Sequence, residues 1–197
     1  MNDPMRVLAV SGSLRAASSN TILLRAAALV APEGVEVVVY GGVGGLPHFN
    51  PDLDRALDDP LLPGPVRALR AAVGAADALL VCSPEYAHGV PGSLKNALDW
   101  LVGGSEMPGK PVALVNASPH SVHAPAQLAE TLRTMSVRVV EGSPFLVPLP
   151  HGAGSEAAAA DPAVAAGLRD VLRALRLTDG AKKASDANQP EQKKRGA

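Results

Sequence analysis

Hydrophobic and polar positions along this chain follow two alternating patterns. Short runs that are apolar at nearly every position are typical of strands that a sheet buries on both faces. These runs lie at residues 6–10, 35–40, 78–83, 112–116 and 137–140. Between them, apolar residues recur at the three- and four-residue spacing of an amphipathic helix. The four helical stripes are Leu23, Ala26, Ala27 and Val30; Val66, Leu69 and Val73; Leu94, Ala97, Leu98 and Leu101; and Leu128, Leu132 and Met135.

The alternation of strands and helices predicts an α/β fold, with a doubly wound parallel sheet of five strands and helices on both faces. Because crossovers between parallel strands are right-handed, the flavodoxin-like strand order 2-1-3-4-5 is favoured. Asp161 and Pro162 are a typical N-cap and first-turn pair for a last helix. We expect residues 1–177 to form one domain. Residues 178–197 are polar and lack the large apolar side chains that would pack against a core, so we expect them to form a disordered tail.

Composition and charge narrow the functional classes. The formal net charge is −1, which argues against a nucleic-acid-binding surface and against a strongly acidic electron shuttle. No apolar run approaches the roughly 20 residues that a membrane helix needs, and the first residues lack the pattern of a signal peptide, so a cytoplasmic location is expected. Cys82 is the single cysteine, which excludes an intrachain disulfide and a paired-thiol redox centre. Redox chemistry would therefore need a bound cofactor.

The loop after the first predicted strand has the chemistry of a phosphate site. In open α/β sheets, ligands bind beyond the carboxyl ends of the strands where the strand order reverses, here between the first and third strands. Residues 11–20 combine Gly12, several serines, Asn20 and the cation of Arg15 just before a helix N-terminus. The loop has neither a Walker lysine nor a GxGxxG pattern, so a monophosphate fits better than a dinucleotide. A plain polar turn with a serine cap is the alternative.

The loop after the third predicted strand, residues 83–93, contains two prolines and two glycines that make an irregular, rigid backbone. Such a backbone presents N–H and C=O groups to the edge of a planar ring, and Tyr86 adds an aromatic side chain. The alternative is a stiff connection with Trp100 as ordinary core.

Taken together, GSLRxxSxN after the first strand and SPEYxxGxPGxLKNALDW after the third closely resemble the NADPH-dependent FMN reductase family. The resemblance covers roughly residues 6–140, and the family includes flavodoxin-like quinone, azo-dye and chromate reductases. It implies bound FMN, with the phosphate on the first loop, the isoalloxazine ring beside the second, and a serine after the fourth strand facing the flavin. The residues implied are Ser13, Arg15, Ser18 and Asn20; Pro84, Glu85 and Tyr86; and Ser118.

One loop departs from the family pattern. After Ala117 and Ser118 the family usually continues with glycines, whereas this chain has Pro119, His120 and, further on, His123. The departure leaves the width of the active site open. Two loop histidines without further ligands are not expected to hold a metal, and Cys82 is expected to serve packing.

The resemblance implies an NAD(P)H oxidoreductase in which FMN takes hydride and passes two electrons to a small acceptor such as a quinone, an azo compound, chromate or free flavin. No catalytic side chain is required, and the residues do not distinguish NADPH from NADH. A homodimer or homotetramer is expected, with Trp100 as a candidate interface anchor. The alternatives are a non-enzymatic FMN electron carrier or redox-sensing module, and a flavodoxin-like domain that has lost FMN and acts through protein contacts.

Overall fold

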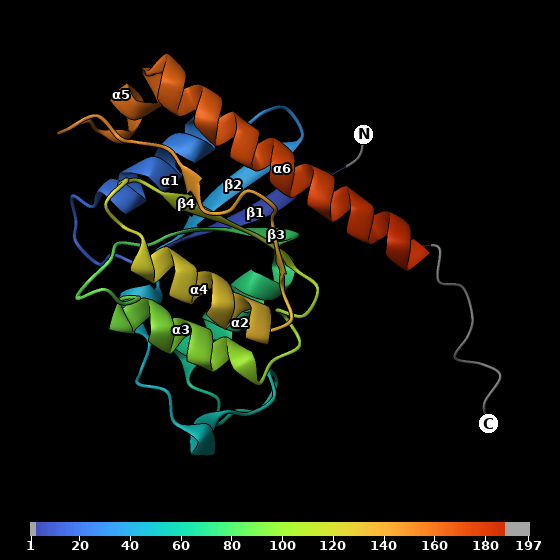
Figure 1. Ribbon diagram of the computed structural model, residues 1–197. Helices are drawn as coiled ribbons and strands as arrows, with labels where there is room; N and C mark the ends of the chain where they lie inside the picture. The colour runs from blue at the N-terminus through green and yellow to red at the C-terminus, as the bar shows by residue number, and fades with distance from the viewer. Residues whose placement is uncertain (1–2, 188–197) are drawn as a thin grey trace.

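The computed structural model describes residues 3–187 and is built around a parallel sheet (Figure 1). Its strands lie in the order β2-β1-β3-β4-β5, which confirms the predicted fold class and order. The four long strands coincide with the predicted apolar runs to within one residue at each end. They are β1 (Met5–Ser11), β2 (Val35–Tyr40), β3 (Ala78–Cys82) and β4 (Pro111–Asn116).

The fifth position of the sheet is divided between two short strands, of which the sequence predicted one. β5 (Arg138–Val139) pairs with the start of β4, and β6 (Phe145–Leu146) pairs in parallel with its end. Between them, the Ser143 hydroxyl accepts the N–H of Leu114 at 3.2 Å and replaces a backbone partner. Prolines stand on both sides of β6, which hid this strand from the hydrophobic pattern.

Helices cover both faces of the sheet, as predicted (Figure 1). On one face lie α1 (Ser19–Leu29), α5 (Ser155–Ala160) and α6 (Pro162–Ala187), and on the other α2 (Gly64–Ala75), α3 (Gly92–Val102) and α4 (His123–Thr134). Alternate residues of β1 point to opposite faces, so Val7 and Ala9 join one core cluster and Leu8 and Val10 the other. None of the helices in the described part of the chain is long and apolar enough to cross a membrane.

Helix α6 begins as predicted and ends later than predicted. The Asp161 carboxylate accepts the N–H groups of Ala163 and Val164 at 2.9 and 3.0 Å, as an N-cap should. The helix then continues to Ala187, so the expectation of disorder from residue 178 is wrong for residues 178–187. Beyond Leu177, the last large apolar side chain, the helix contains buried Asp179 and then four good helix formers at residues 181–184. The rest of the expected tail, residues 188–197, lies outside the described residues.

The long connection after β2 contains two short 3-10 helices, η1 (Val43–Gly45) and η2 (Pro51–Leu53), and docks on α3. The Pro47 carbonyl accepts the Trp100 indole N–H and the Asn96 amide, each at 2.9 Å. Phe49 meets the Trp100 ring edge to face, with ring centroids 5.0 Å apart. Trp100 is therefore fully buried within its own chain, and its predicted role as an interface anchor is wrong. Helical spacing did not reveal this, because the partner loop buries the side of α3 that the apolar stripe leaves uncovered.

Candidate functional site

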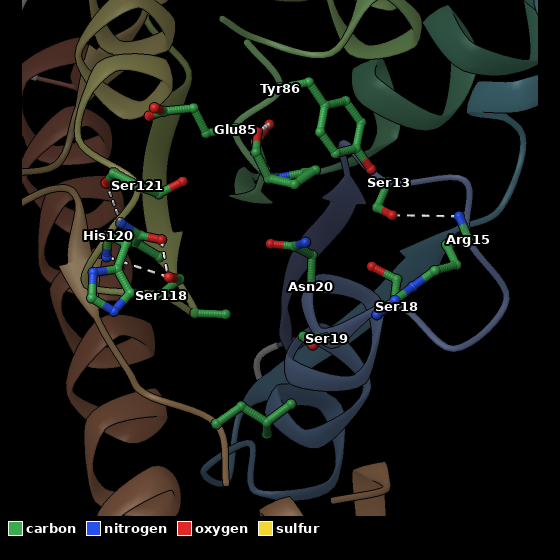
Figure 2. A pocket seen from close by; sticks show the side chains of 15 residues that line it. Ser13, Arg15, Ser18, Ser19, Asn20, Glu85, Tyr86, Ser118, His120 and Ser121 are labelled. Atoms are coloured by element: carbon green, nitrogen blue, oxygen red, sulfur yellow. Dashed lines mark hydrogen bonds between the residues drawn. The ribbon is translucent and has the colours of Figure 1, made fainter. Parts of the chain in front are cut away.

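A cavity of about 490 Å³ opens at the carboxyl end of the sheet, between the loops that follow β1, β3 and β4. It contains all eight of the residues that the sequence singled out: Ser13, Arg15, Ser18, Asn20, Pro84, Glu85, Tyr86 and Ser118. Figure 2 shows the first-loop residues on one side, Glu85 and Tyr86 above them, and Ser118 with His120 across the cavity. The loops come together because the carboxyl ends of parallel strands meet at one edge of a sheet.

The first loop is held in place by its own hydroxyl groups. The Ser11 side chain accepts the N–H of Ser13 at 3.2 Å and the hydroxyl of Thr21 at 2.9 Å. The Gly12 N–H donates to the Cys82 carbonyl at 2.8 Å, which joins the loop to the end of β3. A Cβ atom on Gly12 would lie 2.6 Å from the Ser83 hydroxyl, so the close approach of these two loops requires glycine here.

Ser18 is the most informative residue of this loop. It precedes the first turn of α1 and is 1% exposed, yet its hydroxyl has no hydrogen-bond partner among the described residues. A buried hydroxyl without a partner carries a desolvation cost of about 1–3 kcal/mol. Because the residue lines the cavity, a ligand oxygen there would supply the missing bond. Arg15 lies beside it and makes no ion pair within residues 3–187.

The second loop is closed by a tight turn at the mouth of the cavity. Tyr86 and Gly89 exchange two backbone hydrogen bonds of 3.1 and 2.9 Å. Ala87 and His88, at the tip, have φ angles of 49° and 60°, the left-handed region that turns of this type require. The turn leaves the Tyr86 side chain 56% exposed beside the cavity.

Glu85 connects the second loop to α4. Its carboxylate accepts the N–H groups of His123 and Ala124 at 2.7 and 2.9 Å, at the positive end of the helix dipole. The hydrogen bond from Ala124, with that from His123, holds the pKa of Glu85 below its ordinary value. The side chain thus caps a helix, and its neighbouring backbone faces the cavity.

The loop after β4, which differs from the family pattern, is ordered by hydrogen bonds to the Asn116 side chain. The Asn116 side chain donates to the Ser121 carbonyl at 2.7 Å and accepts the N–H of Ser118 at 3.1 Å. The Ser118 hydroxyl in turn accepts the N–H of His120 at 3.3 Å. These bonds give the loop a defined shape without the glycines that the family pattern has.

The histidines form a pair that the sequence did not suggest. His88 and His123, rather than His120 and His123, stack with ring centroids 4.2 Å apart and planes 20° apart. With Glu85 they bring three ligand atoms within 4.8 Å of one another. The lone pair of an imidazole nitrogen lies in the plane of its ring, so the nearly parallel rings of His88 and His123 do not aim their lone pairs at one ion. The Glu85 carboxylate is already engaged in capping α4. That this region holds no metal stays a prediction.

Cys82 lies at the end of β3 and is fully buried. Its thiol donates to the Asn20 side-chain oxygen at 3.1 Å, and burial raises its pKa to about 12. Because the thiolate is the reactive form, this cysteine is inert at neutral pH and serves packing and the position of Asn20.

Seven further residues line the cavity that sequence reasoning did not select: Ser19, Ser83, Asn116, Ala117, His120, Ser121 and Leu149. Asn116 could have been predicted from the sequence, because it ends a predicted strand at the same edge of the sheet. Leu149 had no local signal, since it follows the unpredicted strand β6.

Residues 5–151 match the profile of the NADPH-dependent FMN reductase family. The chain belongs to this family. Among curated relatives, an NAD(P)H-dependent FMN reductase of Pseudomonas aeruginosa is 40% identical over 120 residues, which are 60% of this chain and 62% of that protein. A quinone reductase of Escherichia coli is 34% identical over 113 residues, 57% of each chain. The matches thus span less than two thirds of these relatives.

Solved structures place the family in the flavodoxin-like fold. A flavoenzyme NAD(P)H:(acceptor) oxidoreductase from Paracoccus denitrificans has a TM-score of 0.66 and 26% identity, covering 86% of this chain and 97% of that chain. A flavodoxin from the domain Archaea has a TM-score of 0.58 and covers 88% of this chain and 99% of its own. At 19% identity, the flavodoxin shows the shared fold alone.

Proposed function

We propose that this protein binds FMN in the cavity of Figure 2 and passes two electrons from NAD(P)H to a small acceptor such as a quinone. The observation that carries the proposal is Ser18, a buried hydroxyl with no partner that lines the cavity at the start of α1. The Ser18 hydroxyl would donate a hydrogen bond to an oxygen of a phosphate bound by the first loop. The family match and the quinone reductases among the relatives support the reaction.

The cavity has the properties that FMN needs. Its volume of about 490 Å³ falls in the range of roughly 300–1,000 Å³ that is usual for ligand pockets. Ser13, Ser18, Asn20 and the Arg15 cation offer donors to a phosphate, and the N-terminus of α1 favours its negative charge. Pro84, Tyr86 and Ser118 also line this cavity and would border a planar ring attached to that phosphate.

Bound FMN supplies the hydride-accepting and two-electron chemistry, which side chains lack. This chain's residues bind and orient. The first loop holds the phosphate, the rigid second loop presents backbone groups to the ring, and Glu85 keeps that loop against α4. No side chain needs to act as an acid or base, and the inert Cys82 thiol takes no part.

The phosphate is expected to matter for binding. Riboflavin should bind about tenfold or more weakly than FMN, and Arg15→Ala should weaken FMN by about 1.5–3 kcal/mol, the usual range for a hydrogen bond to a charged group. Fluorescence titration of flavin into stripped protein measures both affinities. Equal affinity for riboflavin and FMN would contradict the phosphate site.

Turnover separates the enzyme from a non-enzymatic FMN module. In the enzyme, NADPH or NADH bleaches the bound flavin without oxygen, and an added quinone restores its absorbance over many cycles. Cys82→Ser should turn over normally. A flavin that binds tightly but is reduced only by a protein partner would instead identify an electron carrier or redox sensor.

We further propose that the working form is a symmetric dimer or a dimer of dimers, and that it works in the cytoplasm, where reduced nicotinamides are available. Three apolar or aromatic side chains that are more than half exposed support the assembly. Tyr86 lines the cavity, and Leu14 and Val122 are chain neighbours of the lining residues Ser13 and Ser121. A contiguous patch of exposed apolar residues beside a site is typical of a surface that a partner covers. A second copy would shield the substrate side of the flavin from water.

A further inference from the structure

A second cavity, of about 480 Å³, opens on the other side of the first loop. It lies between that loop, the first turns of α1 and the end of β2, and it continues to η1. Ser13 and Arg15 line both cavities, so the two share a wall. The hydrogen bonds of Ser11 with Ser13 and Thr21 stiffen this wall.

The charge in this second cavity has one sign. Arg15 and Arg25 line it, and no acidic residue does. Arg25 is exposed on α1 and, among the described residues, makes neither an ion pair nor a side-chain hydrogen bond. Most other arginines of the fold are in use, such as Arg70 with Glu106 at 3.0 Å. Two uncommitted guanidinium groups facing one cavity favour an anionic ligand, because their planar donors match phosphate oxygens.

Neutral groups complete the lining. Val39 and the Tyr40 ring form part of the wall at the end of β2, with their side chains packed on opposite faces of the sheet. Gly41 and Gly44 keep the neighbouring chain narrow. A wall of this kind suits a planar base or a sugar attached to the phosphate.

We propose that this second cavity binds the 2′-phosphoadenosine end of NADPH while the nicotinamide reaches the flavin in the first cavity. The inference rests on the proposed function and adds its reductant. A dinucleotide has two ends, and the two cavities adjoin across Ser13 and Arg15. NADPH differs from NADH only in the 2′-phosphate. Arg25 lines the second cavity and not the first, whereas Arg15 lines both. Arg25 therefore selects NADPH.

Nucleotide fragments test the cavity without turnover. Adenosine 2′,5′-bisphosphate and 5′-AMP are titrated by calorimetry into FMN-loaded, oxidised protein. The bisphosphate should bind about tenfold or more tightly than 5′-AMP, the worth of one charge-assisted hydrogen-bonded contact. Arg25→Gln should remove most of that difference and leave the affinity for FMN unchanged. Arg15→Ala should weaken the binding of both FMN and the bisphosphate, because Arg15 lines both cavities.

A matched control is Arg169→Gln, which neutralises an exposed arginine of α6 that lines neither cavity. It should bind both nucleotides as the wild type does. In steady state, Arg25→Gln should raise the KM for NADPH about tenfold with kcat and the KM for NADH little changed.

Four results would overturn the inference: equal affinity for the two nucleotides, an equal loss in the Arg169 variant, displacement of FMN by the bisphosphate, or equal competition by inorganic phosphate, which would indicate a general anion site. Failure of the protein to bind FMN would instead refute the proposed function. An Arg25-dependent preference for the bisphosphate in such FMN-free protein would still support the second cavity as a site for the 2′-phosphate.

Discussion

Glu85 ties the second loop to α4, together with the Gln127 side chain, which donates to the His88 carbonyl at 3.2 Å, and the stacked rings of His88 and His123. The ionised Glu85 carboxylate accepts two backbone N–H groups at the start of that helix, and these bonds lower its pKa. A carboxyl group whose folded-state pKa is lowered stabilises the protein above its unfolded-state pKa, near 4.3 for Glu, and this stabilisation is lost as the pH falls through the folded-state value.

The pH dependence of stability tests this role. Glu85→Gln should be less stable than the wild type at neutral pH, because an amide caps a helix N-terminus without the charge. The difference should shrink as the pH falls below about 4, where the wild-type carboxyl also becomes neutral. Urea unfolding of both proteins between about pH 3 and 7 measures it, with Glu130→Gln, exposed on α4, as the control. A difference that stays constant across this range would refute the charge as the cause.

Among the elements, the connection after β2 and helix α3 behave as one unit. Two hydrogen bonds from α3 meet at the Pro47 carbonyl, and the Asn96 side chain also accepts the N–H of Phe49 at 2.7 Å. At its far end, the connection is held by buried Arg70, which pairs with Asp54 at 3.4 Å. A long loop is thus fixed beside the cavities rather than left mobile.

Trp100→Phe should loosen this unit. Losing the indole N–H and part of the ring is expected to cost about 1–3 kcal/mol of unfolding free energy and to speed proteolytic cleavage within residues 41–63. Denaturant unfolding and limited proteolysis measure the two effects. The oligomeric mass should not change, because Trp100 is buried inside its own chain. A change of mass with unaltered stability would restore the interface role.

At the scale of the whole molecule, the exposed apolar residues around the cavity predict assembly. Closed two-fold pairing is the commonest arrangement of soluble oligomers, and it would cover Leu14 and Val122 in both copies. Light scattering at micromolar protein should give about twice the chain mass of 20.1 kDa, or four times for a dimer of dimers. Val122→Glu, next to the lining residue Ser121, should shift the mass toward the monomer and lower turnover, whereas Val102→Glu, exposed at the end of α3 and next to no lining residue, should not. A fully active protein near 20.1 kDa would refute the dimer.

Much of the fold followed from periodicity, because strands buried on both faces must be apolar throughout and amphipathic helices must repeat every three to four residues. The site residues were predictable for a related reason. Ser18 and Tyr86 lie far apart in the chain, yet each follows a strand whose carboxyl end is fixed by the sheet order. Strand β6 was not predictable, because it has only two residues and the prolines on either side of it argue against a strand. The continuation of α6 beyond residue 177 was not predictable either.

The sequence by itself determined the strand order, the chemistry of the loops and the family. Tertiary structure alone decided which side chains those loops leave unsatisfied or already employ. Trp100 is core because a distant proline carbonyl reaches it, and Glu85 caps a helix 38 residues further along the chain. Arg25 has no side-chain partner among residues 3–187, because the fold brings none of their acidic groups to it. The physical reason is common to all three: a hydrogen bond or an ion pair depends on distances of about 3–4 Å, and only the packed chain sets those between residues far apart in sequence.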